Sequence, residues 1–236
     1  MRLVRACVGA AGELAISLAV FLFAFVAWQL WWTDLEAGRA QAQTVTRIER
    51  DFAVPPVQGA ATAAPPPAEA RVHLRIPLGD AFALIRVPRF GSTFIRPVLE
   101  GTTRNILAEG VGHYIGTALP GEVGNFATAG HRTTYAKPYS DIDTLRTGDV
   151  IVIETRTAYH VYSVMSHEIV LPSAIEVIEP VPGKPGARPV VAVMTMTSCN
   201  PRYSAAQRYV VHAALKATYS RAEGLPVSVL APPKGA

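Results

Sequence analysis

The most strongly patterned segment of the chain is an apolar run near its N-terminus. Leu14 to Trp32 contains no charged residue and ends in a cluster of tryptophans. A helix of this length rises about 28 Å, which is close to the hydrocarbon thickness of a bilayer, about 30 Å. The run therefore predicts a transmembrane helix over residues 14–32.

The charges on either side of this run indicate its orientation. Arg2 and Arg5 precede it, whereas Asp34 and Glu36 follow it. The positive-inside rule then keeps residues 1–13 in the cytoplasm and places the rest of the chain outside. A cleaved signal peptide is the alternative, but the run is long for one and its tryptophan-rich end lacks a small-x-small cleavage site. We therefore expect a single-pass anchor in the plasma membrane with an extracellular domain.

A stalk and linker, residues 33–70, follow the predicted anchor. Thr33–Ala53 is polar and is expected to leave the membrane as a helix. Val54–Ala70 is rich in Pro and Ala, so we expect an extended, semi-rigid spacer there. We expect this segment to add nothing to a hydrophobic core, so deletion of residues 1–70 is predicted to leave a folded domain.

The remaining apolar residues of the chain come in short, strand-like runs. They predict one folded domain over residues 71–230, with 231–236 as a C-terminal tail. The runs are Phe82–Val87, Thr93–Leu99, Val150–Ile153, Tyr159–Met165, Val190–Cys199 and Arg208–Leu215. Helical patterns are few, namely Thr102–Glu109 and a single turn at Ser140–Leu145. Short strands punctuated by Gly and Pro are typical of a closed β-barrel, so the fold class is mostly β with a few short helices.

Charge and cysteine content narrow the possible functions. The net charge is +4, from 22 basic and 18 acidic residues, and no basic run marks a nucleic-acid site. The two cysteines, Cys7 and Cys199, are expected on opposite sides of the membrane and so cannot pair. An external cysteine without a disulfide partner is either a reactive thiol or a small buried hydrophobe.

Cys199 and Arg208 are the first candidates for chemistry. Cys199 ends the apolar strand VVAVMTMTSC and is followed by Asn200-Pro201, so it is expected at a strand tip. Arg208 begins the next strand, and a hairpin between the two strands would make them neighbours. An arginine there would favour a thiolate and could stabilise an oxyanion. The alternatives are a solvated arginine at the strand edge, or Arg202 in the connecting loop as the functional arginine.

Among the histidines, His131 is the best candidate. It follows the short strand NFATAG and opens the polar loop HRTTYAKPYSD, with Gly130 giving the backbone room. The others lie at the domain edge, in a loop or inside strand patterns, namely His73, His113, His160, His167 and His212. No pair has the spacing of metal ligands, so we expect neither a metal nor another cofactor.

Three sequence blocks together resemble the signature blocks of sortases. They are AGHRTTY at 129–135, TMTSCNP at 195–201 and SAAQR at 204–208. The stretch GHYIGTALPGEVGN at 112–125 and the run CNPRYSAAQR resemble class E sortases in particular. The resemblance covers roughly residues 80 to 218 and the order of anchor, His, Cys and Arg. Two positions depart from the usual T-L-x-T-C signature, because Met196 replaces Leu and Ser198 replaces Thr.

The resemblance implies a sortase-like β-barrel and a cysteine transpeptidase of an actinobacterial, Gram-positive surface. Such an enzyme cleaves an LAxTG-like or LPxTG-like sorting motif between Thr and Gly, and it joins the Thr to a cell-wall amine. Cys199 is then the nucleophile, His131 the acid for the leaving amine, and Arg208 the residue that holds the substrate or oxyanion. Tyr114, Thr197 and Ser198 are the expected substrate-binding residues. The resemblance thus makes secreted proteins with a sorting motif and a peptidoglycan precursor amine the partners.

Two other functional classes stay open. One is another extracellular cysteine acyl enzyme, either a peptidase or an enzyme like the L,D-transpeptidases, whose S-H-G-C-x-R signature differs from Thr197-Ser198-Cys199-Asn200. The other is a non-enzymatic β-barrel module on the cell surface. A buried Cys199 in such a module would resist alkylation in the native state.

Overall fold

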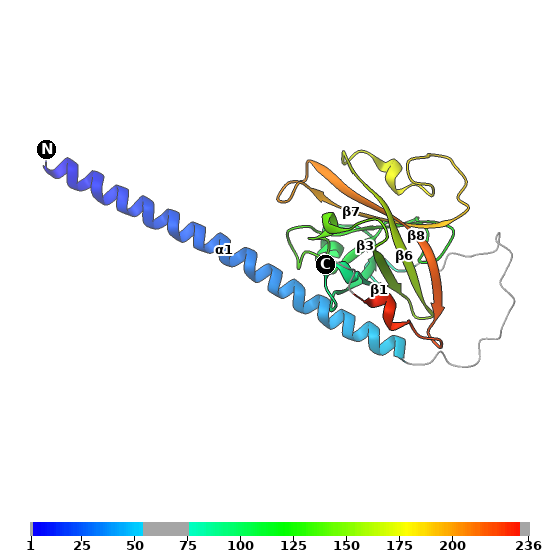
Figure 1. Ribbon diagram of the computed structural model, residues 1–236. Helices are drawn as coiled ribbons and strands as arrows, with labels where there is room; N and C mark the ends of the chain where they lie inside the picture. Colours follow the sequence, from blue (N-terminus) through cyan, green and yellow to red (C-terminus); the bar gives the residue numbers. More distant parts are fainter. Residues whose placement is uncertain (1, 54–75, 232–236) are drawn as a thin grey trace.

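The computed structural model describes residues 2–53 and 76–231, which form one long helix and a closed β-barrel (Figure 1). The helix, α1, runs from Arg2 to Ala53 without a break and projects far beyond the barrel at its N-terminal end. The predicted linker Val54–Ala70 lies outside the described residues.

Eight strands close the barrel in the order β1-β2-β3-β4-β7-β8-β6-β5. Neighbouring strands are antiparallel except β2–β3 and β4–β7, which are parallel. The strands are β1 (Ala81–Arg86), β2 (Ile95–Glu100), β3 (Val111–His113), β4 (Gly124–Ala129), β5 (Val150–Glu154), β6 (Ala158–Val170), β7 (Ala192–Asn200) and β8 (Gln207–Ser220). The short helices are α2 (Arg104–Glu109) and the 3-10 turns η2 (Pro88–Phe90), η3 (Ile142–Thr144), η4 (Ile175–Ile178) and η5 (Val227–Leu230).

Apolar side chains from all parts of the barrel fill its interior. Phe126, Tyr139 and Ile151 are fully buried there. On β7, Met194 and Met196 point into this core, and because strand side chains alternate, the intervening residues face the other way. That alternation places the side chains of Thr195, Thr197 and Cys199 together on the outer face of the barrel.

The strand pattern in the sequence agrees with the barrel. All six predicted strands are present, as are the α2 helix and the turn at η3, although β6 and β8 extend beyond the predicted ends. The strand β3 was expected to be a loop. It is short and contains Gly112, so its local pattern is weak, and its pairing with β2 and β4 holds it in place.

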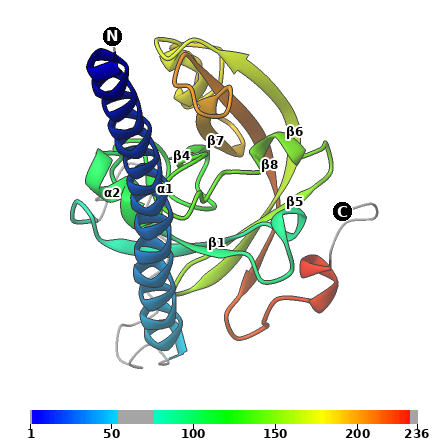
Figure 2. The ribbon, with the colours of Figure 1, turned by 90° about the vertical axis from the view of Figure 1, so that its left-hand side faces the viewer.

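The predicted anchor and stalk form the single helix α1. Among the residues that the structure describes, α1 is the helix long and apolar enough to cross a membrane, with a mean hydropathy of 2.2 over its most apolar window. Its N-terminal half is exposed, whereas its C-terminal part lies across the barrel beside α2 and β1 (Figure 2).

The prediction that residues 1–70 add nothing to the core is wrong. Val45 and Ile48 are buried against Leu84 of β1, with Phe52 packed beside them. Residues 33–53 read as polar because large apolar residues are few there, and Val45, Ile48 and Phe52 are spaced by three and four. At helical spacing these positions form one stripe, and that stripe faces the barrel.

Candidate active site

Three adjacent strands, β4, β7 and β8, position the residues singled out in the sequence. Cys199 lies at the C-terminal end of β7, the middle strand. Arg208 pairs with it directly across the antiparallel β7–β8 ladder, as the hairpin argument predicted. His131 follows the end of β4 on the other side, so in the order of the strands Cys199 lies between His131 and Arg208.

The parallel pairing of β4 with β7 brings His131 next to Cys199. Ala129 pairs with Thr197, and the amide of Gly130 donates to the carbonyl of Thr197 at 3.1 Å. Extended to the next residues, this register sets His131 beside Cys199 on neighbouring strands, which lie about 4.8 Å apart. A Cβ at Gly130 would lie 2.7 Å from the ring of Tyr139, so this strand end requires glycine.

The imidazole of His131 lies in a partly buried site just past the end of β4. Its ring centroid is 5.0 Å from that of Tyr135, and its Nε2 is buried without a hydrogen-bond partner in the structure. Burial lowers the pKa of His131 below its ordinary value, and the positive charge of Arg104 lowers it further. The shift favours the neutral imidazole over the imidazolium.

Arg132 is a buried residue of this site that the sequence reasoning did not single out. Its Nη1 donates to Oδ1 of Asn200 at 2.8 Å and to the carbonyl of Cys199 at 3.3 Å, and its Nη2 forms an ion pair with Asp143 at 2.6 Å. The guanidinium also lies over the ring of Tyr209. Arg132 thus ties the chain after His131 to the end of β7. In the sequence, the feature that could have pointed to Arg132 is its position directly after the candidate histidine.

Arg208 is one of the residues that line a groove on the outer face of the barrel. Its Nη1 donates to the carbonyls of Ala205 and Gln207, at 3.0 and 2.9 Å. The groove encloses about 100 Å³, and Tyr114 and Thr197 line it together with Arg208. The Tyr114 hydroxyl and Thr197 Oγ1 are 3.0 Å apart.

The opposite wall of the groove is the connection between β6 and β7. It is largely apolar and runs from the last residue of β6 into η4. The residues that line the groove here are Val170, Leu171, Pro172, Ala174, Ile175, Val177 and Ile178. Asn125 of β4 donates to the carbonyl of Val177 at 3.3 Å, and Thr195 Oγ1 donates to the same carbonyl at 3.3 Å. His212 of β8 is hydrogen-bonded to Thr195, with 2.9 Å between its Nδ1 and Thr195 Oγ1. This buried polar network fixes the wall to the barrel, and no motif in the sequence marked it.

Other candidate residues lie apart from the thiol and the groove. Ser198 is buried, and its Oγ donates to the carbonyl of Gly130 at 2.8 Å, so it supports the histidine-bearing strand end. Arg202 is exposed and pairs with Asp141 at 3.2 Å. His113 is buried against Glu100, with 2.6 Å between Nδ1 and Oε2. Within the described part of the chain, no group of three or more His, Cys, Asp or Glu residues could hold a metal ion.

Comparisons with known proteins agree with this geometry. Residues 85–216 match the sortase domain family. The chain is 32% identical to sortase SrtE1 of Streptomyces coelicolor over 92% of its own length, and it spans 59% of the length of that relative. It is 30% identical to sortase SrtE2 of the same organism over 89% of this chain and 82% of that one.

A solved structure is also similar to the barrel. The structure of sortase E from Streptomyces avermitilis superposes with a TM-score of 0.59 at 39% sequence identity. The match covers 64% of this chain and 98% of that one, so the region of likeness is the barrel rather than the N-terminal helix.

Proposed function

This chain belongs to the sortase family, and on that premise we propose that it is a membrane-anchored cysteine transpeptidase with Cys199 as its nucleophile. The observation that carries the proposal is the order of three neighbouring strand ends, which sets Cys199 between His131 and Arg208. The relatives reported above carry the name sortase E, which supports the class E resemblance.

The first half of the proposed reaction forms a thioester. The Cys199 thiolate attacks the carbonyl carbon of the Thr–Gly bond in an LAxTG-like or LPxTG-like sorting motif. The carbon–nitrogen bond then breaks, and His131 gives its proton to the departing glycine nitrogen. The lowered pKa of His131 makes its imidazolium a stronger acid for this transfer, although it also reduces the protonated fraction.

The second half of the reaction makes a new amide. An amine of a cell-wall precursor attacks the thioester carbonyl, passes a proton to His131 and displaces the Cys199 sulfur. Arg208 stands across the ladder from the thiol, where a guanidinium can donate charge-assisted hydrogen bonds to the oxyanion or to the substrate backbone. Its present acceptors are backbone carbonyls of its own loop, so substrate binding requires a change of partner.

The groove beside Arg208 is the proposed site for the sorting motif. Tyr114 and Thr197 supply hydroxyl groups within a mainly apolar channel, which suits a short peptide with small and aliphatic side chains. Ser198 does not face this groove, so its proposed contribution is limited to supporting the strand end that carries His131.

The N-terminal helix supports the membrane part of the proposal. Its apolar stretch is long enough to span a bilayer, and the flanking arginines favour an N-terminus in the cytoplasm and a barrel outside. The proposed partners are therefore secreted proteins that bear a sorting motif and an amine on a peptidoglycan precursor.

The test uses the full-length chain in detergent with an LAxTG-type peptide and an amine, with product masses as the readout. We expect a transpeptidation product from the native chain and none from Cys199→Ala. His131→Ala should lose most of the activity. Arg208→Ala should lower the rate by about 10²–10³, the typical cost of removing one oxyanion donor. Arg208→Lys should recover little, because a point charge does not replace a planar fork.

Arg202→Ala is the matched control, because Arg202 is an arginine in the loop between Cys199 and Arg208, where it is exposed and pairs with Asp141. It should keep substantial activity. A dead Arg202→Ala beside an active Arg208→Ala would reverse the arginine assignment, and an active Cys199→Ala would exclude the cysteine mechanism. A hydrolysed peptide without amine transfer would favour the peptidase alternative.

A further inference from the structure

A second hollow lies outside the barrel, next to the groove of the candidate active site. It encloses about 530 Å³ between the β3–β4 connection and the β6–β7 connection. Ile115 and Val123 line it from the first connection, and Ile178 and Glu179 line it from the second. The mechanism proposed above makes no use of this hollow.

The second hollow is continuous with the groove. Ile175 and Ile178 of η4 line both of them. Thr197, near the C-terminal end of β7, lines the groove, whereas Gly124 lines the hollow and pairs with Ala192 at the start of β7. The groove and the hollow therefore follow one another along β7, and the groove lies nearer to the end that carries the cysteine.

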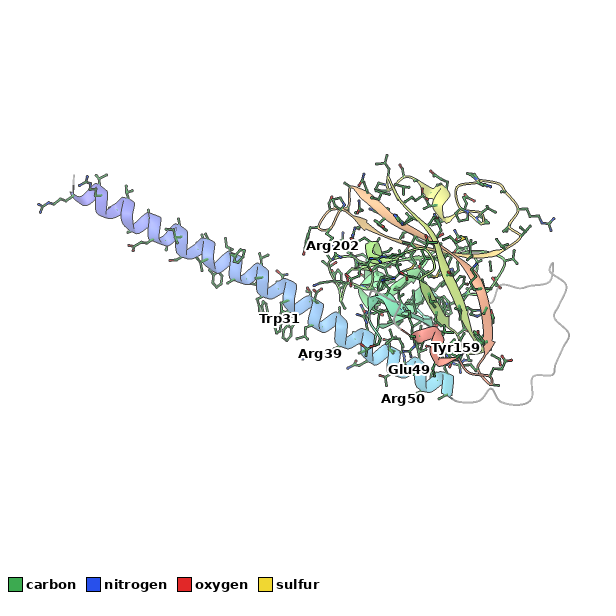
Figure 3. All side chains as sticks on the ribbon, viewed as in Figure 1. Trp31, Arg39, Glu49, Arg50, Tyr159 and Arg202 are labelled. Atoms are coloured by element: carbon green, nitrogen blue, oxygen red, sulfur yellow. The ribbon has the colours of Figure 1, made fainter. Side chains whose placement is uncertain are left out.

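The spacing along β7 indicates which part of a bound peptide reaches the hollow. From Cys199 back to Ala192 is seven residues, about 23 Å at about 3.3 Å per residue. Figure 3 shows the same separation, because Arg202 marks the loop that follows Cys199 and η4, in yellow, lies away from that loop. A four-residue motif with its Thr carbonyl at Cys199 covers about 13 Å when extended. The next two or three residues on its N-terminal side then reach the hollow.

The surface of the hollow is largely apolar and open to solvent. Ile115, Val123 and Ile175 are each more than half exposed. Single exposed aliphatic residues are ordinary, but several around one hollow mark a binding surface. The aliphatic side chains of an extended peptide would cover these residues.

Two glutamates add negative charge to this apolar surface. Glu122 and Glu179 both line the hollow, and its described lining residues include no Lys or Arg. In the part of the chain that the structure describes, neither glutamate forms an ion pair. A lysine or arginine can lay its aliphatic stem on the apolar surface and bring its charge to a carboxylate. The hollow therefore suits a short segment that combines aliphatic and basic side chains.

We propose that the second hollow binds the residues immediately upstream of the sorting motif and that it favours a basic residue with aliphatic neighbours there. This inference rests on the proposed function, because the motif in the groove brings the upstream residues to the hollow. The occupant is the substrate's own chain rather than a separate partner, since a tethered segment binds at a high effective concentration. Substrate choice then depends on residues outside the motif.

The experiment measures equilibrium binding of fluorescent peptides by anisotropy. The full-length chain carries Cys199→Ala, so that no peptide is consumed, and is held in detergent. One peptide is an LAxTG-type motif alone, the second is the same motif preceded by Val-Lys-Val, and the third is preceded by Val-Glu-Val. We expect the Lys extension to lower Kd about tenfold, comparable to burying one methylene in an apolar pocket. The Glu peptide should bind about two- to fivefold more weakly than the Lys peptide, as expected for one exposed ion pair.

Three variants locate the effect in the hollow. Glu179→Lys should reverse the preference in favour of the Glu peptide, a gain that misfolding does not produce. Glu176→Lys is the matched control, because Glu176 is exposed in the same turn but does not line the hollow, and it should keep the preference for Lys. Ile115→Ser should weaken binding of both extended peptides and leave the motif alone unchanged.

Equal affinity for the three peptides, an unchanged preference in Glu179→Lys, or binding of no peptide at all would overturn the proposal. The proposed function is tested separately, by turnover of the motif peptide with the native chain. Turnover of that peptide together with equal affinities would refute the role of the hollow alone. Tighter binding of the Lys peptide without turnover of any peptide by the native chain would refute the enzymatic proposal alone.

Discussion

Replacement of Ile48 by Ala tests whether the stalk helix is part of the folded domain. Ile48 is 3% exposed and packs with Val45 and Leu84 between α1 and β1. Removal of a buried isoleucine side chain down to Ala costs about 2–5 kcal/mol. This cluster is small and lies outside the barrel, where the helix can shift to close the cavity, so we expect about 2–3 kcal/mol.

The assay is differential scanning calorimetry of the full-length chain in detergent. For a protein of this size, about 1 kcal/mol lowers the Tm by about 2–4 °C, so Ile48→Ala should lower it by about 5–10 °C. Ile16→Ala is the matched control, because Ile16 is 67% exposed on the projecting part of α1 and contacts no barrel strand. The control should leave the barrel transition within about 1 °C.

A double substitution sharpens the test. Leu84→Ala removes the barrel side of the same contact. The double variant should therefore lose less stability than the sum of the two single variants, since contacting residues couple by about 0.5–3 kcal/mol. If Ile48→Ala behaves like Ile16→Ala and the losses at positions 48 and 84 are strictly additive, α1 does not pack on the barrel in solution. The stalk would then be free of the barrel.

Two further predictions concern the loop and the charge around His131. Arg104→Gln removes a cation that lowers the pKa of His131, so that pKa should rise. The acid limb of the pH profile of kcat/KM should then move to higher pH, and the plateau near neutral pH should increase. An acid limb that does not move would contradict the coupling between Arg104 and His131. Gln41→Ala removes the hydrogen bond to the carbonyl of Tyr135. Tyr135, Ala136 and Lys137 have φ of 54°, 58° and 48°, and this left-handed conformation costs a non-glycine residue roughly 1–2 kcal/mol. We expect kcat to fall several-fold with little change in KM in steady-state assays, and an unchanged kcat would show that this contact does not position His131.

Local patterns in the sequence were sufficient to predict the apolar helix, most of the strands and the proximity of Cys199 and Arg208. The apolar run at 14–32 depends only on its own composition, and a strand is visible from its own alternation and flanking turns. Cys199 and Arg208 could be paired in advance because a short connection joins consecutive strands, and such strands usually form a hairpin. Their proximity is therefore a nearly local property.

Other features depended on contacts between distant parts of the chain. His131 reaches Cys199 only because β4 pairs in parallel with β7, and nothing in either strand specifies that partner until the whole barrel closes. The short strand β3 owes its conformation to two neighbours rather than to its own residues.

The role of the stalk was decided in the same way. Val45 and Ile48 are too widely spaced in a polar segment to predict a buried face by themselves. They are buried because Leu84 presents an apolar partner on the outside of β1, and helix burial requires both surfaces. The sequence by itself determined an apolar helix long enough to cross a membrane, and the tertiary structure decided that the polar continuation of this helix packs on the barrel.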